Sequence, residues 1–291
     1  MSFLIFALVY PLIWLLSKLP FRVLYIISDG VYLILYYLVG YRRDVVRFNL
    51  KTAFPKMDSE TLKTTEKRFY HHFCDLFIEV IKTISISEKS LKKRYTFTNI
   101  EVLEAYQKKG QPVILTLGHY ASYEWIFTLQ LYFKENPGYG IYKKIKNKYF
   151  DQMLRDIRSK WNSYLVPNKQ AREKIKEILS TKKGFTIFGF VMDQSPANKI
   201  NKHFAPFFDV KTPFFTGVEQ LSKQHDLPVV FIVTQKTKRG HYQSTFHVLA
   251  DNPKQHDDYT ITDAYASMLA KQIAIAPEYY FWTHKRFKFM K

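Results

Sequence analysis

The feature that most constrains this chain is a short stretch in its middle, from Val113 to Trp125. Val113–Leu117 is an unbroken apolar run whose length and composition predict a buried β-strand. Gly118 ends this run, and an apolar pattern with helical spacing begins near Trp125. Strand, tight turn and helix in succession form the repeating unit of parallel sheets, so we expect an α/β protein.

Strand and helix patterns then alternate toward the C-terminus. The expected strands are 113–117, 140–142, 163–166, 185–192, 228–234 and 242–248. The expected helices are 123–133, 148–160, 169–181, 216–225 and 262–276. Residues 42–110 are predicted to be mainly helical, with a short basic connector at 87–95. We therefore predict a mostly parallel central sheet flanked by helices, with functional groups beyond the carboxyl ends of its strands.

The N-terminal residues are more apolar than the rest of the chain. Ser2–Leu19 is almost continuously apolar, and a second apolar stretch runs from Val23 to Gly40. Each has about the length, roughly 18–20 residues, that crosses a bilayer. Pro11 in the first stretch and Asp29 in the second indicate that at least one of them lies in the membrane plane instead.

Arginines at 42, 43 and 47 follow the apolar stretches directly, which places the rest of the chain on the cytoplasmic side. We predict a membrane anchor at residues 1–40 and a cytoplasmic-face domain at 41–291. A buried helical hairpin in a soluble protein is the alternative interpretation.

The composition points to an anionic partner. The formal net charge is +19, and residues 142–183 hold thirteen Lys or Arg against four Asp or Glu. Nucleic acid is one candidate, but aromatic residues mixed with cations beside an apolar segment favour anionic lipid headgroups. The single cysteine, Cys74, excludes an internal disulfide and is expected in the packed core, and no zinc-type spacing occurs.

Two polar residues flank the turn after the first strand of the alternating region. His119 follows Gly118, and Glu124 lies five residues further on. Positions five apart on a helix are roughly 140° apart, so we expect His119 to precede the helix and to fold back toward Glu124. A carboxylate on one ring nitrogen makes the other a general base for a hydroxyl proton. The alternative is a turn histidine that caps the helix beside an exposed glutamate.

Taken in order, these residues resemble the bacterial lipid A biosynthesis acyltransferases, the late or secondary acyltransferases of the lysophospholipid acyltransferase-like superfamily. The resemblance covers essentially the whole chain. It is carried by Arg43…Asn49…Phe54-Pro55, His119-x4-Glu124, Tyr142…Asn147 with Arg158, Asp193-Gln194, and Trp282…His284-Lys-Arg286.

The resemblance implies a monomeric enzyme on the cytoplasmic face of the inner membrane. Its reaction would move a fatty acyl group from an acyl-carrier-protein thioester to a hydroxyl of a lipid A precursor. Acyl-coenzyme A remains open as the donor. No metal, no tightly bound cofactor and no nucleic acid is implied.

The resemblance also implies roles for four catalytic residues. His119 would take the hydroxyl proton while Glu124 holds its ring. Arg158, or backbone N–H groups at the helix start, would stabilise the oxyanion. Asp193 would hold Arg158 or the acceptor.

Four further residues are implied in substrate binding: Asn147, Lys143, Lys144 and Gln194. The chain departs from the family pattern at Ala121 and Ser122, where the family has glycine and asparagine. It also has lysines at 143 and 144 in place of an Arg-Pro pair, and lysine lacks the planar fork that grips phosphate.

Two alternatives stay open on the sequence. In the first, the chain is an acyltransferase of the same superfamily whose acceptor is a lysophospholipid or an aminolipid. In the second, from a different class, the chain is a non-catalytic basic protein that binds membrane or nucleic acid.

Overall fold

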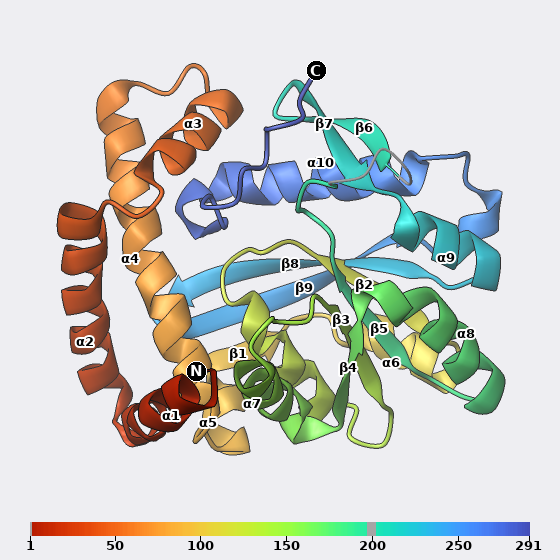
Figure 1. Cartoon of the computed structure of the whole chain (residues 1–291). Coiled ribbons are helices and arrows are strands. Elements are labelled where there is room, and N and C mark those ends of the chain that lie inside the picture. The colour runs from red at the N-terminus through yellow and green to blue at the C-terminus, as the bar shows by residue number, and fades with distance from the viewer. Residues whose placement is uncertain (1, 197–201) are drawn as a thin grey trace.

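The structure is a computed structural model that describes residues 2–196 and 202–291. A seven-stranded sheet with the order β1-β9-β8-β2-β5-β3-β4 forms its centre (Figure 1). The strands are β1 (Tyr95–Phe97), β2 (Val113–Leu117), β3 (Gly138–Tyr142), β4 (Ser163–Pro167), β5 (Ile187–Val191), β8 (Val229–Lys238) and β9 (His241–Ala250). Neighbouring strands are parallel except β8 and β9, which form an antiparallel hairpin. The predicted fold class is confirmed.

Helices surround this sheet. The N-terminal half supplies α1 (Ser2–Lys18), α2 (Phe21–Leu33), the π-helical η1 (Ile34–Val39), α3 (Arg43–Ala53), α4 (Ser59–Thr83), α5 (Glu88–Arg94) and α6 (Glu101–Lys108). The remainder supplies the 3-10 helix η2 (Tyr123–Leu131), α7 (Lys148–Arg158), α8 (Ala171–Thr181), α9 (Gly217–His225), α10 (Thr260–Ile275) and the 3-10 turn η6 (Pro277–Tyr279).

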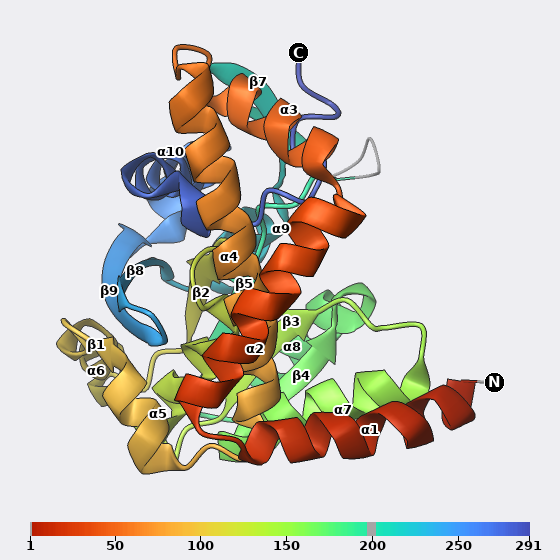
Figure 2. The same ribbon diagram turned by 90° about the vertical axis from the view of Figure 1, so that its left-hand side faces the viewer.

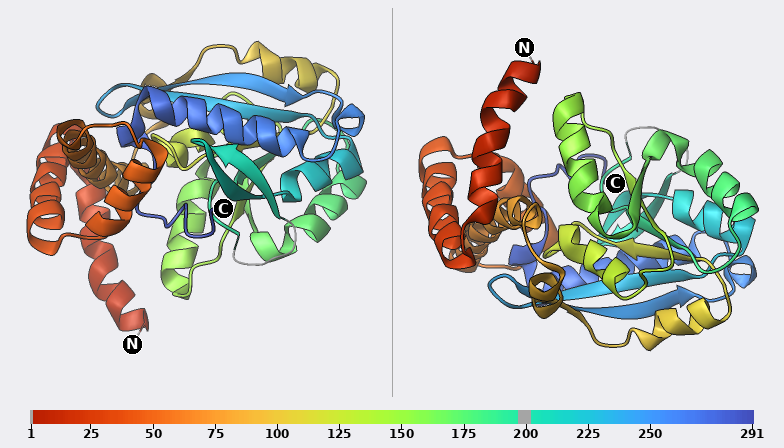
Figure 3. Two further views of the ribbon diagram at one scale, coloured as in Figure 1. Left: turned by 90° about the horizontal axis from the view of Figure 1, so that it is seen from above. Right: turned by 90° about the horizontal axis from the view of Figure 1, so that it is seen from below.

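Opposite faces of the sheet pack against different helices (Figure 3). Ile114 and Phe231 face the α10 side, where Tyr265 and Leu269 complete one buried cluster. Leu115 and its same-face neighbours pack against α6 and η2 in a second cluster. All five residues of β2 are buried, so this strand is covered on both faces and contributes to both clusters.

Two segments differ from the sequence expectation. The basic connector at 87–95 is the helix α5, whose first turn is capped by the Ser87 hydroxyl, accepting from Ser90 N at 3.3 Å. An unexpected antiparallel hairpin joins β6 (Lys202–Phe207) to β7 (Val210–Phe215). Its turn residues Phe208 and Asp209 have φ values of 54° and 60°. Asn-Gly or Asp-Gly is the usual sequence signature of such a turn, and this hairpin does not have it.

The N-terminal helices lie on the outside of the domain. Figure 2 shows α1 running beside α7 and α2 beside α4, as their contacts confirm. The segment Phe21–Val39 is long and apolar enough to cross a membrane, by length and composition. Large apolar side chains project outward from it and from α1: Leu8 is 74% exposed and Leu38 is 80% exposed. The division between residues 40 and 41 stays a prediction.

Candidate active site

His119 is carried at the carboxyl end of the central strand. Gly118 lets α10 pack closely against the end of this strand, since a Cβ at this position would collide with the Leu269 side chain. The Tyr265 hydroxyl donates to the Leu117 carbonyl at 2.9 Å and fixes the last residue of β2. The packing of α10 therefore sets the point at which His119 leaves the sheet.

The carboxylate that holds His119 is Asp193, just beyond the end of the neighbouring strand β5. Asp193 Oδ1 lies 2.6 Å from His119 Nδ1, and Asp193 Oδ2 accepts the His119 backbone N–H at 3.1 Å. Asp193 is buried, while about a fifth of the His119 side chain is exposed. Because Nδ1 is engaged, the ring presents Nε2 for proton transfer.

Glu124 pairs with Arg158 instead. Arg158 Nε donates to Glu124 Oε2 at 2.9 Å, and Nη2 donates to Oε1 at 2.5 Å, a bidentate ion pair. The expected pairings, Glu124 with His119 and Asp193 with Arg158, are therefore wrong. The physical reason is that β2 and β5 are adjacent, so their carboxyl ends meet, whereas η2 directs Glu124 toward the end of α7.

His119 and Asp193 each shift the pKa of the other. Burial of the ring opposes its charged form, but the Asp193 carboxylate outweighs burial and raises the pKa of His119. Burial alone would raise the pKa of Asp193, yet the bonds from His119 hold it below its ordinary value. Asp193 therefore stays ionised while His119 titrates.

A large cavity opens beside this pair. Its volume is about 850 Å³, and its walls include His119, Glu124 and Arg158 together with many apolar residues of the sheet. Lys143 and Gln194, two of the predicted substrate-binding residues, also line it. A cluster of polar residues thus lines a large, mainly apolar cavity, the usual form of a small-molecule site.

The other two predicted substrate-binding residues, Lys144 and Asn147, are not among the residues that line this cavity. Lys144 is exposed on the loop after β3. Asn147 is the N-cap of α7, where its side chain accepts from Tyr149 N at 3.0 Å. Their roles toward a substrate stay predictions.

A family model described as bacterial lipid A biosynthesis acyltransferase matches residues 1–289. The chain belongs to this family. It is 24% identical to a lipid A biosynthesis lauroyltransferase of Escherichia coli (strain K12) over 95% of this chain and 89% of the relative. The corresponding values are 22%, 95% and 88% for the palmitoleoyltransferase of the same strain, and 25%, 93% and 86% for a Haemophilus influenzae lipid A biosynthesis acyltransferase. The resemblance stated from the sequence is confirmed, and acyl transfer is the activity class.

In this acyltransferase the C-terminal segment is hydrogen-bonded to the turn that carries His119. The Phe281 N–H donates to the His119 carbonyl at 3.0 Å, and the Ala121 N–H donates to the Tyr279 carbonyl at 2.9 Å. Ala121 has a φ of 48°, the left-handed conformation that favours glycine, the residue that the resemblance implies for this position. These two hydrogen bonds from the C-terminal segment therefore hold the buried turn in its conformation.

Residues far apart in the sequence position the Asp193 side of the pair. Asn49 of α3 donates to the carbonyls of Trp282 and His284, both at 2.7 Å. Burial lowers the pKa of His284 to about 4, so its neutral ring accepts the Ser195 N–H at 3.1 Å. Sequence reasoning did not give Asn49 or Ser195 a role, although Asn49 and His284 belong to the motifs that carry the resemblance.

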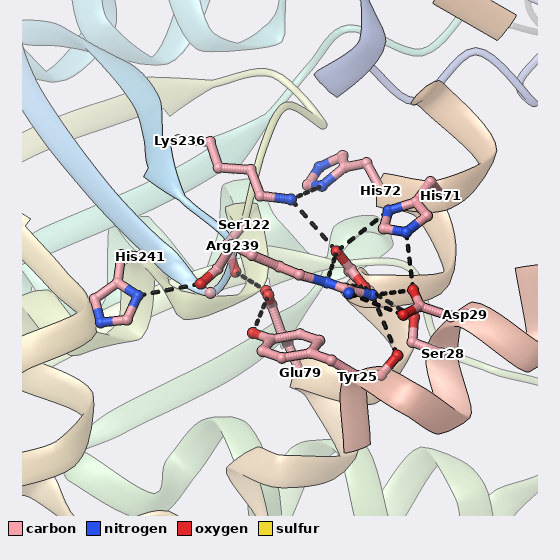
Figure 4. A network of polar contacts seen from close by, with 12 residues as sticks. Tyr25, Ser28, Asp29, His71, His72, Glu79, Ser122, Lys236, Arg239 and His241 are labelled. Carbon is pink, nitrogen blue, oxygen red and sulfur yellow. Dashed lines mark hydrogen bonds and ion pairs between the residues drawn. The ribbon is translucent and has the colours of Figure 1, made fainter. Parts of the chain in front are cut away.

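A buried carboxylate braces the same turn from α4 (Figure 4). Glu79 accepts from the hydroxyls of Ser122 at 3.2 Å, Tyr25 at 3.0 Å and Tyr242 at 2.9 Å. Burial raises the pKa of Glu79 to about 7, although Lys236 acts in the opposite direction. The Glu79 side chain thus joins α2, the β8–β9 hairpin and the turn that carries His119.

The neighbouring part of this network contains a group with metal-ligand spacing. Ligand atoms of Asp29, His71 and Asp75 lie within 4.8 Å of one another. Arg239, however, donates to Asp29 Oδ1 at 2.5 Å and to Asp75 Oδ1 at 2.6 Å (Figure 4). The guanidinium supplies the positive charge between these carboxylates, so we interpret the group as an ion-pair clamp.

Proposed function

We propose that this acyltransferase moves a fatty acyl chain from an acyl-carrier-protein thioester to a hydroxyl of a lipid A precursor. The observation that carries the proposal is the carboxylate-held His119 at the rim of a deep, largely apolar cavity. A base at the mouth and an apolar interior fit a reaction between a hydroxyl and a long-chain acyl group.

In the proposed mechanism Asp193 keeps the proton on His119 Nδ1, and Nε2 removes the proton from the acceptor hydroxyl. The oxygen attacks the thioester carbonyl, forming the new C–O bond. When the tetrahedral intermediate collapses, the C–S bond breaks and the leaving sulfur takes the proton from Nε2. Asp193 serves as the partner that orients the base, the role that the sequence had suggested for Glu124.

Glu124 and Arg158 then have a separate role in the proposal. The bidentate contact uses Nε and Nη2 of Arg158 and leaves Nη1 outside the ion pair. We assign Arg158 to the negative charge that develops on the thioester oxygen. A single oxyanion donor of this kind typically contributes about 3 kcal/mol to the activation free energy.

The proposed partners fit the charge distribution. Acyl-carrier protein and the phosphates of lipid A are anionic, and residues 142–183 carry an excess of nine positive charges, thirteen minus four. Lys143 brings one of these charges to the cavity. The proposed reaction proceeds in a monomer and requires no metal or organic cofactor.

We also propose that residues 1–40 hold the enzyme on the cytoplasmic face of the inner membrane by lying in its surface. One face of α2 is bound to the domain, where Ser28 donates to Asp75 at 2.8 Å and Asp29 pairs with Arg239. Apolar side chains on the outer faces of α1 and α2 remain available for lipid.

A mass spectrum of total lipids tests the proposal, with cells that lack the protein compared with cells carrying wild type or His119→Ala. We expect lipid A to lose the mass of one acyl chain in both defective strains, because the variant rate should fall by about two to four orders of magnitude. A folded, fully active His119→Ala protein would end the mechanism. Unchanged lipid A with an accumulating lysophospholipid or aminolipid precursor would instead identify a different acceptor.

A further inference from the structure

The cavity follows one face of the sheet away from His119. Parallel register places Leu115, Gly189, Gly140 and Leu165 side by side on β2, β5, β3 and β4. Residues two positions apart on a strand share a face, so the row beneath it contains Ile187, Gly138 and Ser163. All seven residues line the cavity. The floor is therefore a defined surface, and three of its positions lack a side chain.

The glycine at 189 keeps this floor open. A Cβ added there would meet only backbone, the Tyr139 carbonyl oxygen at 3.9 Å and the Gly140 Cα at 4.0 Å. At Gly140 the space is narrower, since a Cβ would lie 3.2 Å from Leu165 and 3.5 Å from Phe127. A larger side chain at 189 would thus project into free space and obstruct the cavity without displacing its walls.

Gln130 of η2 lines the cavity together with Gly138 and Ile187, the first residues of β3 and β5. A Cβ on Gly138 would approach Gln130 Oε1 to 2.5 Å, so this glycine is what lets the amide lie across the floor. Gln130 Nε2 donates to the Asn136 carbonyl at 2.8 Å, which fixes the side chain. Phe133 and Phe185 belong to the packed core. Gln130 is therefore taken as the end wall of the path that runs along β3 and β5.

We infer that Gly189 and Gln130 determine the length of the acyl chain that the enzyme transfers, an inference that rests on the proposed function. Strands rise ~3.3 Å per residue, so the path from Val191 back to Ile187 is roughly 13 Å long. With C–C bonds of ~1.5 Å, roughly ten methylenes of an extended chain fill that path. The ligand is therefore a straight acyl chain of medium length whose methyl end reaches Gln130.

The test is competition among saturated acyl-carrier-protein thioesters of increasing even length, with the purified full-length enzyme and a lipid A precursor. Gly189→Val should lower kcat/KM for the preferred donor by about tenfold or more while retaining transfer from shorter donors. Gly30→Val, at an α2 glycine with nothing within 4 Å of an added Cβ, is the matched control and should keep the wild-type profile.

Substitution at the end wall should act in the opposite direction. Gln130→Ala removes the wall and should move the preference to donors that are longer by a few carbons. Gln130→Leu restores a side chain of similar size and should return the profile to that of wild type. Thermal unfolding of each variant identifies any that fail to fold, and the ratio of long-chain to short-chain rates is independent of the amount of active protein.

The outcomes separate this inference from the proposed function. If wild type transfers no acyl group from any thioester, the proposed function fails. If wild type is active but folded Gly189→Val and Gln130→Ala proteins keep the wild-type length profile, chain-length selection by these residues is overturned. Folded variants inactive toward every length would overturn it too, since shorter donors should still fit.

Discussion

At the scale of single residues, the proposed chemistry of this acyltransferase depends on which carboxylate lies closer to His119. Asp193 contacts both the ring and the backbone of His119, whereas Glu124 is committed to Arg158. Both carboxylates raise the pKa of the His119 ring, and Asp193 raises it more because it contacts the ring directly. Asp193 makes the imidazole more basic, and Glu124 fixes a cation at the rim of the cavity.

Replacing Asp193 by asparagine should change the pH profile as well as the rate. A general base works in its neutral form, so activity rises as the pH increases through the pKa of His119. Asp193 raises that pKa, so the midpoint of the acidic limb of the wild-type pH–activity profile should lie above ~6.5, the pKa of an ordinary histidine. In Asp193→Asn the limb should move to lower pH while kcat falls by orders of magnitude, as measured by kcat/KM across the pH range.

The matched control is Glu124→Gln, which changes the charge of the acid that does not touch the ring. Its acidic limb should move less than that of Asp193→Asn. A larger shift in Glu124→Gln would show that the other carboxylate controls the base.

At the scale of secondary-structure elements, the position of the turn that carries His119 depends on the helices packed around it. A methyl group at Gly118 would collide with Leu269 of α10. We expect Gly118→Ala to destabilise the fold by about 1–3 kcal/mol through overpacking. Chemical unfolding would measure this loss. Leu269→Ala should remove the collision, so the double variant should be more stable than the sum of the single effects predicts; strict additivity would contradict the clash.

The link between α4 and the turn should make stability depend on pH. The folded pKa of Glu79, about 7, lies above its ordinary value because the charged form is buried. The stability contributed by the neutral acid is thus fully present below the unfolded pKa and is lost as the pH rises to about 7. Glu79→Gln removes this titration. As the pH rises from about 4.5 to 7, the Tm of Glu79→Gln should increase relative to that of wild type. A difference in Tm that does not change with pH would contradict the assignment.

At the scale of the whole molecule, the N-terminal helices α1 and α2 carry exposed apolar side chains on the outside of the fold. Leu8 and Leu12 of α1 are 74% and 61% exposed. Burying a leucine in lipid contributes about 1.5–3 kcal/mol, so replacing both by serine should weaken vesicle binding by at least about tenfold per residue. Co-sedimentation with anionic vesicles measures this binding. Val248→Ser, at an exposed apolar position on β9, should leave it unchanged; equal losses in both proteins would exclude α1 as the lipid-binding surface.

Local patterns in the sequence determined most strands of the central sheet, most of the helices and the place of His119 and Asp193 at strand ends, but not the β6–β7 hairpin. Such patterns suffice because apolar periodicity and turn residues act over a few positions. They could not reveal which acid holds His119, since that depends on β2 lying beside β5, whose paired residues are 74 positions apart. The contacts of Asn49 with the C-terminal segment likewise join distant residues. Only the tertiary structure decided these pairings, because the free energy that selects strand neighbours comes from packing of the whole core.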